Sequence, residues 1–352
     1  MKIFLRLLSM AIIVGVLAVA WGVIEYENFI TTPLAFGGKT LHYEVKPGTG
    51  VMKIAQDLDQ RGVIKHWIYL VGLARLEGKA HLIKAGEYEF QNGITPVKLL
   101  DQLVAGQVVE HALTIVEGWN FKQLMDAIKQ NTAITHTLSG MDGMQIMAKL
   151  GWAGQHPEGH FYPDTYHFSK GMTDVAFLQR AYRAMEQRLA TEWDTRNAGL
   201  PLQDPYQALI LASIVEKESA LPDERKRIAG VFIRRLQKGM KLQTDPTVIY
   251  GMGSNFDGNL RRADLTTDTA YNTYLHTGLP PTPIALPSAA AIHAVLHPEP
   301  GNSLYFVARG DGSHEFSASI DAHNKAVKKY QLKGRGSSAL NKAVQSAEHP
   351  QK

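Results

Sequence analysis

The sequence of 352 residues contains no cysteine. It therefore has no disulfide framework, no thiolate nucleophile, no cysteine-ligated zinc and no lipidated cysteine anchor. The excess of basic charge is also small and confined to the ends, because Lys2 and Arg6 contribute +2 and residues 331–352 contribute +3 to a formal net charge of +4. A basic face for nucleic acid is not indicated, and we expect no nucleic-acid partner.

Several catalytic fingerprints are missing as well. There is no GxSxG elbow, P-loop or dinucleotide motif, so a serine hydrolase, a kinase and a dehydrogenase are all without support. His293 and His297 have the i, i+4 spacing that can chelate zinc, but no Glu follows His293 as in HExxH. We favour capping or packing for both histidines and predict no metal and no cofactor, with a chelator-sensitive zinc hydrolase as an alternative.

A long apolar run stands near the N-terminus. Residues 7–24 carry no charge and are just long enough to cross a bilayer core. Because Lys2 and Arg6 precede the run, we expect residues 1–6 in the cytoplasm and the bulk of the chain exported. A signal peptide cleaved after the small residues 18–20 is the alternative, but the apolar run continues past them and favours an uncleaved anchor.

The exported part has the composition of a folded protein, since hydrophobic residues are 45% and charged residues 20% of the chain. After a linker at residues 25–38, strand, turn and helix patterns alternate. Residues 42–45 and 87–90 read as strands, and each is followed by a turn and an amphipathic helix. We expect a small α+β module over residues 39–108.

A larger domain is expected over residues 109–330, with mixed helix and strand. Helical periodicity dominates residues 120–240, interrupted by an aromatic loop at 157–166 that either holds a ligand or, as we favour, packs in a groove. A proline-rich path and a hairpin follow. Residues 331–352 are polar and without periodicity, which indicates a disordered tail.

The most informative predicted helix runs from Asp204-Pro205, a capping residue followed by proline, to about residue 220. At about 100° per residue, its apolar side chains form one broad arc, and Glu218 projects into the middle of that arc. Glu216 falls outside it. A carboxyl group among aliphatic side chains loses hydration, which raises its pKa and suits a general acid. The plainer alternative is a last-turn glutamate in solvent.

A hydrolytic glycosidase usually needs a second carboxylate at a set separation from the first. Asp245 is the candidate, although an aspartate before proline is equally a turn residue. Tyr271, Asn272, Thr273 and Tyr274 supply amide and hydroxyl groups suited to sugar hydroxyls and N-acetyl groups, with aromatic packing as the alternative.

Several of these segments together resemble one family, the YceG-like endolytic murein transglycosylases. The resemblance covers nearly the whole exported chain and rests on residues 158–166, 212–218, 243–247, 271–274, 278–284, 306–308, 312, 314, 316 and 323–324. It implies a fold in which the module at residues 39–108 is LysM-like and binds glycan. The expected class is thus α+β, with an N-terminal transmembrane helix, a small LysM-like module and a larger catalytic domain.

By this resemblance Glu218 is the catalytic residue, in agreement with the helical arc. A lytic transglycosylase protonates the oxygen between N-acetylmuramic acid and N-acetylglucosamine, and the muramoyl C6 hydroxyl then closes on C1 to leave a 1,6-anhydro end. Because the substrate supplies the nucleophile, one carboxyl group serves as acid and then base. Substrate contacts are expected, by position, from Glu158, Tyr166, Gln243, Tyr271, Asn272, Thr273, Tyr274 and Asp245.

The resemblance also implies the setting. A single-pass anchor in the inner membrane would hold the catalytic domain in the periplasm near nascent glycan strands, whose length it would limit. Partners such as the penicillin-binding proteins of cell-wall synthesis are implied by the family. The alternatives are a hydrolytic muramidase, in which Asp245 places a water, and a non-enzymatic peptidoglycan tether.

Overall fold

The computed structural model describes residues 2–38, 40–218 and 221–332. The chain divides into two compact units. Unit 1 comprises Met1–Ala112 and His167–Met172, and unit 2 comprises Leu113–Tyr166 and Thr173–Lys352. The architecture is the expected mixture of helices and short strands, with an apolar helix at the N-terminus.

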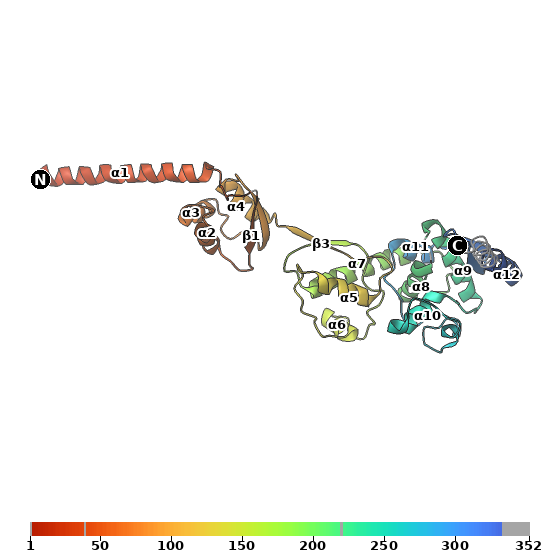
Figure 1. The fold of residues 1–352 in the computed structure, drawn as a ribbon. Helices are drawn as coiled ribbons and strands as arrows, with labels where there is room; N and C mark the ends of the chain where they lie inside the picture. Colours follow the sequence, from red (N-terminus) through yellow and green to blue (C-terminus); the bar gives the residue numbers. More distant parts are fainter. Residues whose placement is uncertain (1, 39, 219–220, 333–352) are drawn as a thin grey trace, which may run out of the picture. The chain divides into compact units, whose positions relative to one another are not determined.

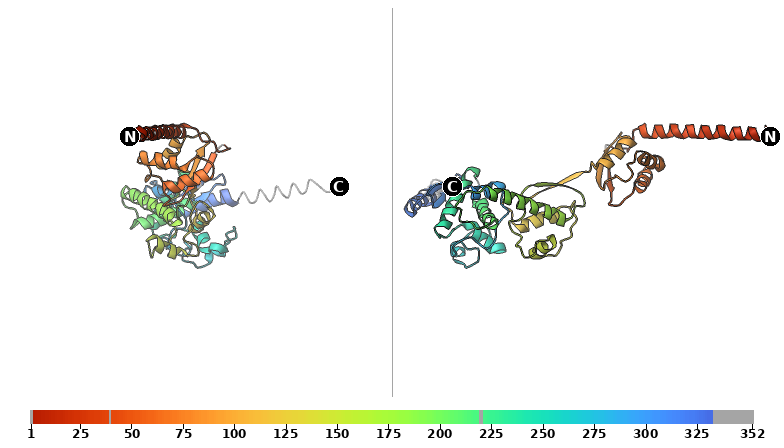
Figure 2. Two further views of the ribbon diagram at one scale, coloured as in Figure 1. Left: turned by 90° about the vertical axis from the view of Figure 1, so that its left-hand side faces the viewer. Right: turned by 180° about the vertical axis from the view of Figure 1, so that it is seen from behind.

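The N-terminal helix α1 spans Lys2–Thr31 and is unbroken (Figure 1, and the right-hand view of Figure 2). It is long and apolar enough to cross a membrane. Large apolar side chains of the expected anchor, such as Leu7, Val14 and Ile24, are exposed, as lipid contact requires. The helix differs from expectation at its end, because the linker predicted from residue 25 begins as helix. There Tyr26 and Phe29 pack against the core of unit 1.

Unit 1 contains an antiparallel strand pair and three helices besides α1. Strand β1 (Thr40–Val45) pairs with β2 (Gly86–Gln91), and the helices are α2 (Val51–Gln60), α3 (Trp67–Leu76) and α4 (Pro96–Ala105). Thr95 caps α4 through its hydroxyl, and Gly106 ends it with φ 71°. Helix α3 was not predicted, because its sequence is apolar with little polar alternation and its buried face is set by tertiary contacts.

Unit 2 is mainly helical. Its helices are α5 (Phe121–Gln130), α6 (Gly143–Leu150), α7 (Asp174–Asp194), α8 (Pro205–Glu218), α9 (Arg225–Gln237), α10 (Asp245–Met252), α11 (Ala289–Leu296) and α12 (Ile320–Val327). Strand β5 (Tyr305–Ala308) pairs antiparallel with β6 (His314–Ser317), which is the predicted hairpin. Strands β3 (Glu110–Thr114) and β4 (Thr165–Ser169) form another pair, in which the chain passes between the two units.

Helix α8 is the centre of unit 2. Every side chain from residue 208 to residue 215 is buried, and α7, α9, α10 and α11 pack against it. The single apolar arc predicted from the sequence is therefore too narrow, because a helix that is apolar all round is enclosed on all sides. Its last turn, which carries Glu216, Lys217 and Glu218, leaves the core, as does its first turn at residues 205–207. This burial gives the last turn a rigid base.

The C-terminal segment follows the hairpin. A π-helical segment covers Lys328–Leu332. Most of the predicted disordered tail, residues 333–352, lies outside the described residues, as do residues 219–220 at the predicted end of the central helix.

Candidate functional site

The two carboxylates in the last turn of α8 have different surroundings. Glu216 accepts hydrogen bonds from the backbone N–H and the hydroxyl of Ser288, at 2.9 and 2.5 Å, and its other oxygen lies 3.4 Å from Arg225. Ser288 is also the N-cap of α11. Both oxygens of Glu216 are thus used to fasten α11 and α9 to α8, which is a structural role.

Glu218 instead has one oxygen held and one oxygen open. Its Oε1 accepts a hydrogen bond from the hydroxyl of Thr244, and no described residue donates to Oε2. Thr244 is buried and is itself fixed, because its N–H donates to the hydroxyl of Thr273 at 3.1 Å. The geometry therefore orients the carboxyl group of Glu218 and leaves Oε2 for another proton acceptor or donor.

The electrostatic surroundings favour the protonated form of Glu218. Burial raises its pKa, and the negative charge of Asp245 raises it further. The hydrogen bond from Thr244 and the charge of His314 act in the opposite direction. Because burial is the largest of these effects, the pKa lies above that of a glutamate in water, as general-acid chemistry near neutral pH requires.

Glu218 faces a pocket of about 580 Å³. Four of the predicted site residues line this pocket: Glu218, Gln243, Asp245 and Tyr274. It is completed by residues for which the sequence assigned no role, including Arg235, Tyr305, His314, His323 and Asn324. The mixture of two carboxyl groups and a guanidinium with amide, phenol and imidazole groups suits a hydroxyl-rich ligand.

Asp245 and Tyr274 form a pair at the edge of this pocket. The Tyr274 hydroxyl donates to Asp245 Oδ1 at 2.6 Å, and Asp245 is the first residue of α10. This hydrogen bond fixes the position of the Asp245 carboxyl group. The pair can therefore present oriented oxygen atoms to a ligand.

Asn272 and Thr273 do not line the pocket, but they contact residues next to it. Asn272 is fully buried, donates to the carbonyls of Leu265 and Thr267, and accepts from the N–H of Tyr274 at 3.0 Å. Thr273 accepts from Thr244 as described. The polar groups of both residues are thus engaged inside the protein, and they fix the segments that carry Thr244 and Tyr274.

Gln243, which lines the pocket, has φ 52°, the left-handed region that a residue with a Cβ rarely adopts. Its N–H donates to the carbonyl of Thr273 at 3.1 Å, which holds the unusual conformation. A strained backbone held by its neighbours beside a pocket is typical of a functional site.

The remaining predicted residues lie away from the Glu218 pocket. Glu158 is 3% exposed, and its oxygens accept from the Phe121 N–H at 2.9 Å and the Tyr250 hydroxyl at 3.1 Å. Burial raises the pKa of Glu158 to about 7. The hydroxyl of Tyr166 donates to the carbonyl of Tyr162. These contacts hold the aromatic loop in place, which fits the packing role favoured for it.

Tyr271 also serves the packing of this region. Its ring lies 4.9 Å from that of Tyr250, and its hydroxyl is 2.7 Å from that of Thr282. Gly159, in the aromatic loop next to Glu158, has φ 85°, and a Cβ at this position would lie 2.5 Å from the side chain of Pro283. Only glycine fits this close approach between the aromatic loop and the proline-rich path.

His314 is the most informative residue that the sequence left unassigned. Its Nδ1 lies 2.6 Å from Glu224 Oε2, and its backbone N–H donates to Glu224 Oε1 at 3.0 Å. This contact orients the imidazole within the pocket wall. Glu224 precedes His314 by 90 residues in the chain, so no local pattern could have paired them.

Arg235 was missed for a similar reason. Its guanidinium donates to the carbonyls of Leu304 and Leu242 at 2.7 and 2.8 Å. In the sequence it is one of two adjacent arginines on an amphipathic helix, and it is buried by segments at residues 241–242 and 304–305 that fold against it.

A larger pocket of about 800 Å³ lies at the opposite end of α8, where Tyr206 and Leu209 line it. His160, Tyr182 and Glu186 also line it, and it contains none of the predicted site residues. Its volume exceeds that of the Glu218 pocket, but a catalytic site is identified by its chemistry and not by its size.

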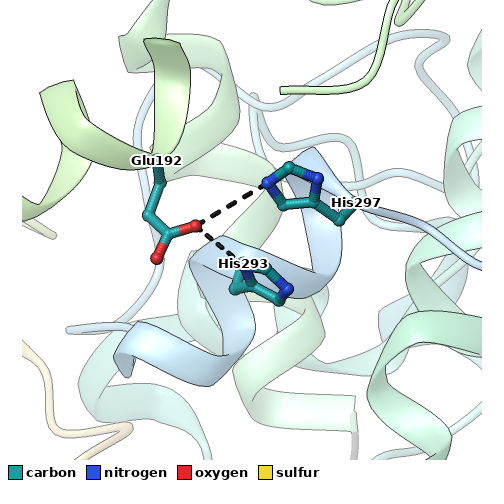
Figure 3. A group of neighbouring side chains, drawn as sticks. All are labelled: Glu192, His293 and His297. Atoms are coloured by element: carbon teal, nitrogen blue, oxygen red, sulfur yellow. Dashed lines mark hydrogen bonds and ion pairs between the residues drawn. The ribbon is translucent and has the colours of Figure 1, made fainter. Parts of the chain in front are cut away.

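One cluster in unit 2 could hold a metal ion. Glu192, His293 and His297 each place a ligand atom within 4.8 Å of the others (Figure 3). The sequence showed the two histidines, but it gave no sign that α7 would bring a carboxylate to them.

Comparisons with known proteins converge on one family. Residues 43–329 match the model of the YceG-like family. An endolytic murein transglycosylase of Bacillus subtilis (strain 168) is 30% identical over 329 residues, which cover 88% of this chain and 90% of that protein. An endolytic murein transglycosylase of Streptococcus pneumoniae (strain D39) is 26% identical, over 92% of this chain and 63% of that protein.

A solved structure agrees. The crystal structure of a YceG-like protein from Listeria monocytogenes superimposes with a TM-score of 0.53 at 28% identity, covering 82% of this chain and 98% of that one. The family model matches most of the chain, and the Bacillus relative and the Listeria structure each cover a similar share of it. This chain therefore belongs to the YceG-like family.

Proposed function

We propose that this chain is an endolytic peptidoglycan lytic transglycosylase, anchored by α1, that cleaves bonds between N-acetylmuramic acid and N-acetylglucosamine in nascent glycan strands. The family, and its relatives that are named endolytic murein transglycosylases, support a murein transglycosylase activity. The observation that carries the mechanism is Glu218, a carboxyl group with a raised pKa and one open oxygen at the wall of a polar pocket.

The proposed reaction uses this carboxyl group twice. Protonated Glu218 gives its proton to the glycosidic oxygen while the bond from that oxygen to C1 of the muramoyl sugar breaks. The C6 hydroxyl of the same sugar then bonds to C1, and its proton returns to Glu218. No water is consumed, so the product has a 1,6-anhydro end and the enzyme regains its starting protonation state.

The pair of Asp245 and Tyr274 is proposed to stabilise the positive charge that develops at C1 in an oxocarbenium-like transition state. The hydrogen bond from Tyr274 aims the carboxylate of Asp245 and moderates its charge. Gln243 is proposed to bind a sugar hydroxyl or N-acetyl group, because its side chain lines the pocket. We assign Asn272 and Thr273 to positioning, and Glu158, Tyr166 and Tyr271 to supporting the adjoining loop.

Residues 39–108 of unit 1 are proposed to be a LysM-like module that retains glycan near the catalytic unit. In support, β1, α2, α3 and β2 follow one another as strand, helix, helix and strand, and the two strands pair antiparallel. The alternative in which this module and the anchor act alone, as a tether, predicts that Glu218 is dispensable.

The proposed location is the inner membrane, with the parts of both units that follow α1 in the periplasm. Lys2 and Arg6 at the start of α1 support this orientation. In spheroplasts, external protease should digest the units, and deletion of residues 2–24 should release the protein from the membrane fraction. Protection of the units from protease would reverse the orientation. Contact with penicillin-binding proteins is implied by the family resemblance.

The decisive experiment is mass spectrometry of products from purified glycan strands, incubated with the full chain in detergent. Wild type should yield internal fragments with anhydro ends, and Glu218→Gln should yield none. The matched control is Glu186→Gln, which removes a carboxylate from the larger pocket and should leave cleavage intact.

Other products would identify the alternatives. Ends heavier by one water would indicate a muramidase in which Asp245 places the water. Equal glycan retention by wild type and Glu218→Gln, without cleavage by either, would indicate a tether. Loss of cleavage in the Glu186 variant alone would move the active site to the larger pocket.

A further inference from the structure

We propose that Glu192, His293 and His297 form a binding site for a divalent transition-metal ion of the zinc class, which fastens the end of α7 to the end of α11. None of the three residues lines the Glu218 pocket. The proposal is therefore independent of the proposed reaction.

The ligand atoms have nearly the spacing that zinc requires. Glu192 Oε2 lies 2.8 Å from His293 Nδ1 and 3.9 Å from His297 Nε2 (Figure 3). In tetrahedral zinc sites, bond lengths near 2.0–2.1 Å place neighbouring ligand atoms about 3.3 Å apart. The two observed separations lie on either side of this value, so small side-chain rotations suffice to seat the ion.

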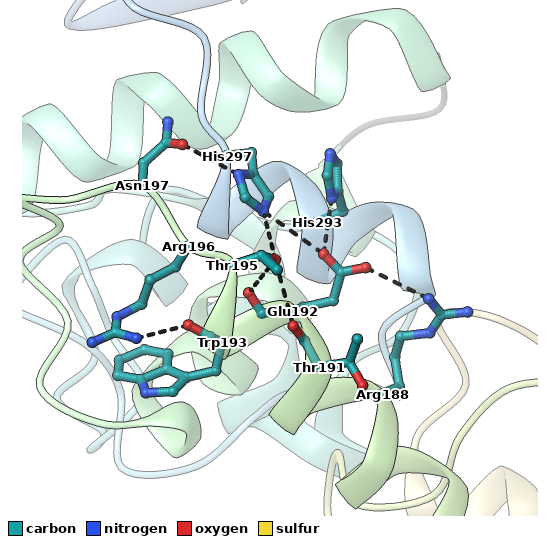
Figure 4. A network of polar contacts seen from close by, with 9 residues as sticks. All are labelled: Arg188, Thr191, Glu192, Trp193, Thr195, Arg196, Asn197, His293 and His297. Carbon is teal, nitrogen blue, oxygen red and sulfur yellow. Dashed lines mark hydrogen bonds and ion pairs between the residues drawn. The ribbon is translucent and has the colours of Figure 1, made fainter.

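The surroundings prepare each ligand. Asn197 Oδ1 lies 3.2 Å from His297 Nδ1, so a proton on Nδ1 would be bound there and the lone pair of Nε2 would face Glu192 (Figure 4). Such a partner on the far nitrogen is the usual support of a metal-bound histidine. Arg188 lies 3.5 Å from Glu192 Oε1, which leaves Oε2 for the metal.

The backbone around the cluster favours a cation. Glu192 lies in the last turn of α7, and His297 caps the C-terminus of α11. The N–H of Asn197 donates to the carbonyl of Leu296 at 2.9 Å, which brings the two helix ends together. Helix C-termini carry partial negative charge, so their convergence adds to the carboxylate charge. The guanidinium of Arg196 is turned away, against Trp193 (Figure 4).

The site is partly open to solvent. The exposed fractions of the side chains are 13% for Glu192, 19% for His297 and 43% for His293. An ion can therefore enter, and water or the nearby Thr195 hydroxyl, 3.4 Å from His297 Nε2, can complete four-coordination. Two imidazoles and one carboxylate suit Zn²⁺ or Co²⁺, whereas Mg²⁺ and Ca²⁺ prefer oxygen ligands alone.

The bound ion would act on the scaffold. Helices α7 and α11 both pack against α8, whose last turn carries Glu218. A metal bond between residues about 100 positions apart, as Glu192 and His293 are, stabilises the native state by binding it selectively.

The test is metal titration of the full chain, purified in detergent without a histidine tag and stripped with chelator. Co²⁺ should bind with one ion per chain and a visible ligand-field spectrum, Zn²⁺ should displace it, and Mg²⁺ should not. Zn²⁺ should also raise the Tm. The variants are Glu192→Gln and His297→Gln, each expected to weaken binding at least about tenfold, and Asn197→Ala, expected to weaken it about 10-fold to 100-fold.

The matched control is His276→Gln. His276 Nε2 lies 2.7 Å from Asp268, which makes a surface pair of one imidazole and one carboxylate without a third ligand. This variant should bind Co²⁺ and Zn²⁺ as wild type does. Equal binding by wild type, Glu192→Gln and His297→Gln would overturn the proposal, as would absence of specific binding in wild type. A Tm that rises equally in all the proteins would do so as well.

Discussion

The pH dependence of the reaction tests the proposed role of Glu218, because a substitution of its neighbour Thr244 should change the pKa of Glu218 without removing the proposed acid. Thr244→Val removes the hydroxyl that donates to Glu218 and keeps the shape of the buried side chain. The hydrogen bond stabilises the ionised carboxylate, so its loss raises the pKa of Glu218. If the protonated form is the active one, activity should persist to higher pH.

The size of this shift follows from the strength of the bond. A hydrogen bond to a charged group contributes about 1.5 kcal/mol at the low end of measured values. One pH unit corresponds to about 1.4 kcal/mol. In the wild type, the protonated carboxyl group keeps part of the hydrogen bond with Thr244, so the low end of these energies applies. The alkaline limb of the pH–rate profile should therefore move to higher pH by about one unit in Thr244→Val.

Asp245→Asn provides the opposite perturbation. The charge of Asp245 raises the pKa of Glu218, so its removal should move the alkaline limb toward lower pH. The assay is the rate of anhydro-end formation between pH 5 and 9, normalised to the maximum for each variant, because Asp245→Asn should also reduce the maximal rate. Normalisation separates the position of the limb from the loss of charge stabilisation.

A limb that stays in place in Thr244→Val, or moves toward lower pH, would contradict the assignment of Glu218 as the titrating acid. A wild-type profile that is flat from pH 5 to 9 would do the same. Thr273→Ala distinguishes these cases from a simple packing defect, because it frees the Thr244 N–H and should shift the limb less than Thr244→Val does.

Three further predictions concern stability, measured by urea or thermal unfolding of the full chain. Gly159→Ala should destabilise more than Gly140→Ala, because both positions have positive φ but only a Cβ at 159 meets the proline ring described above. Glu216→Ala should cost about 3 kcal/mol, since it leaves the partly buried Arg225 and the cap of α11 without their acceptor. Burial raises the pKa of Glu158 to about 7, so between pH 4.5 and 7 the native state holds a proton that the unfolded state has lost. The unfolding free energy should therefore fall by up to about 3 kcal/mol over this pH range. Glu158→Gln should remove this pH dependence.

Elements whose partners lie close by in the chain were predictable. Thr95 and Gly106 mark the two ends of helix α4, and Pro205 marks the start of α8. Each of these residues sets the helix boundary through the backbone conformation or hydrogen bonds of its immediate neighbours in the chain. The β5–β6 hairpin closes through a short turn for the same reason. Strand β4 was not predicted, because it is completed by β3, about 50 residues earlier, and its own sequence lies at the end of a turn-rich loop.

The candidate acid was accessible from the sequence twice over. The helical pattern and the family resemblance both selected Glu218 over Glu216, and the structure gives the physical difference between them. Glu216 has both oxygens bonded within the scaffold, whereas Glu218 keeps one oxygen toward a pocket. Its assignment as the catalytic acid stays a prediction until the substitution is measured.

Residue type alone could not divide substrate contacts from supports. Asn272 and Tyr274 carry groups equally suited to sugars, yet the amide of Asn272 is used by three backbone groups while the Tyr274 hydroxyl reaches the pocket pair. Whether a polar atom is available depends on which donors and acceptors the fold brings to it. That information is spread over segments distant in the chain.

The sequence by itself determined the apolar N-terminal helix, the mixed α+β class and the glutamate at the end of the central helix, because composition and local periodicity act within a few turns of backbone. Tertiary structure alone decided the rest. It placed Thr244 on Glu218, His314 on Glu224 and Glu192 beside His293, pairs separated by 26, 90 and 101 residues. Such pairs form only when apolar helices pack, and packing is a property of the whole unit.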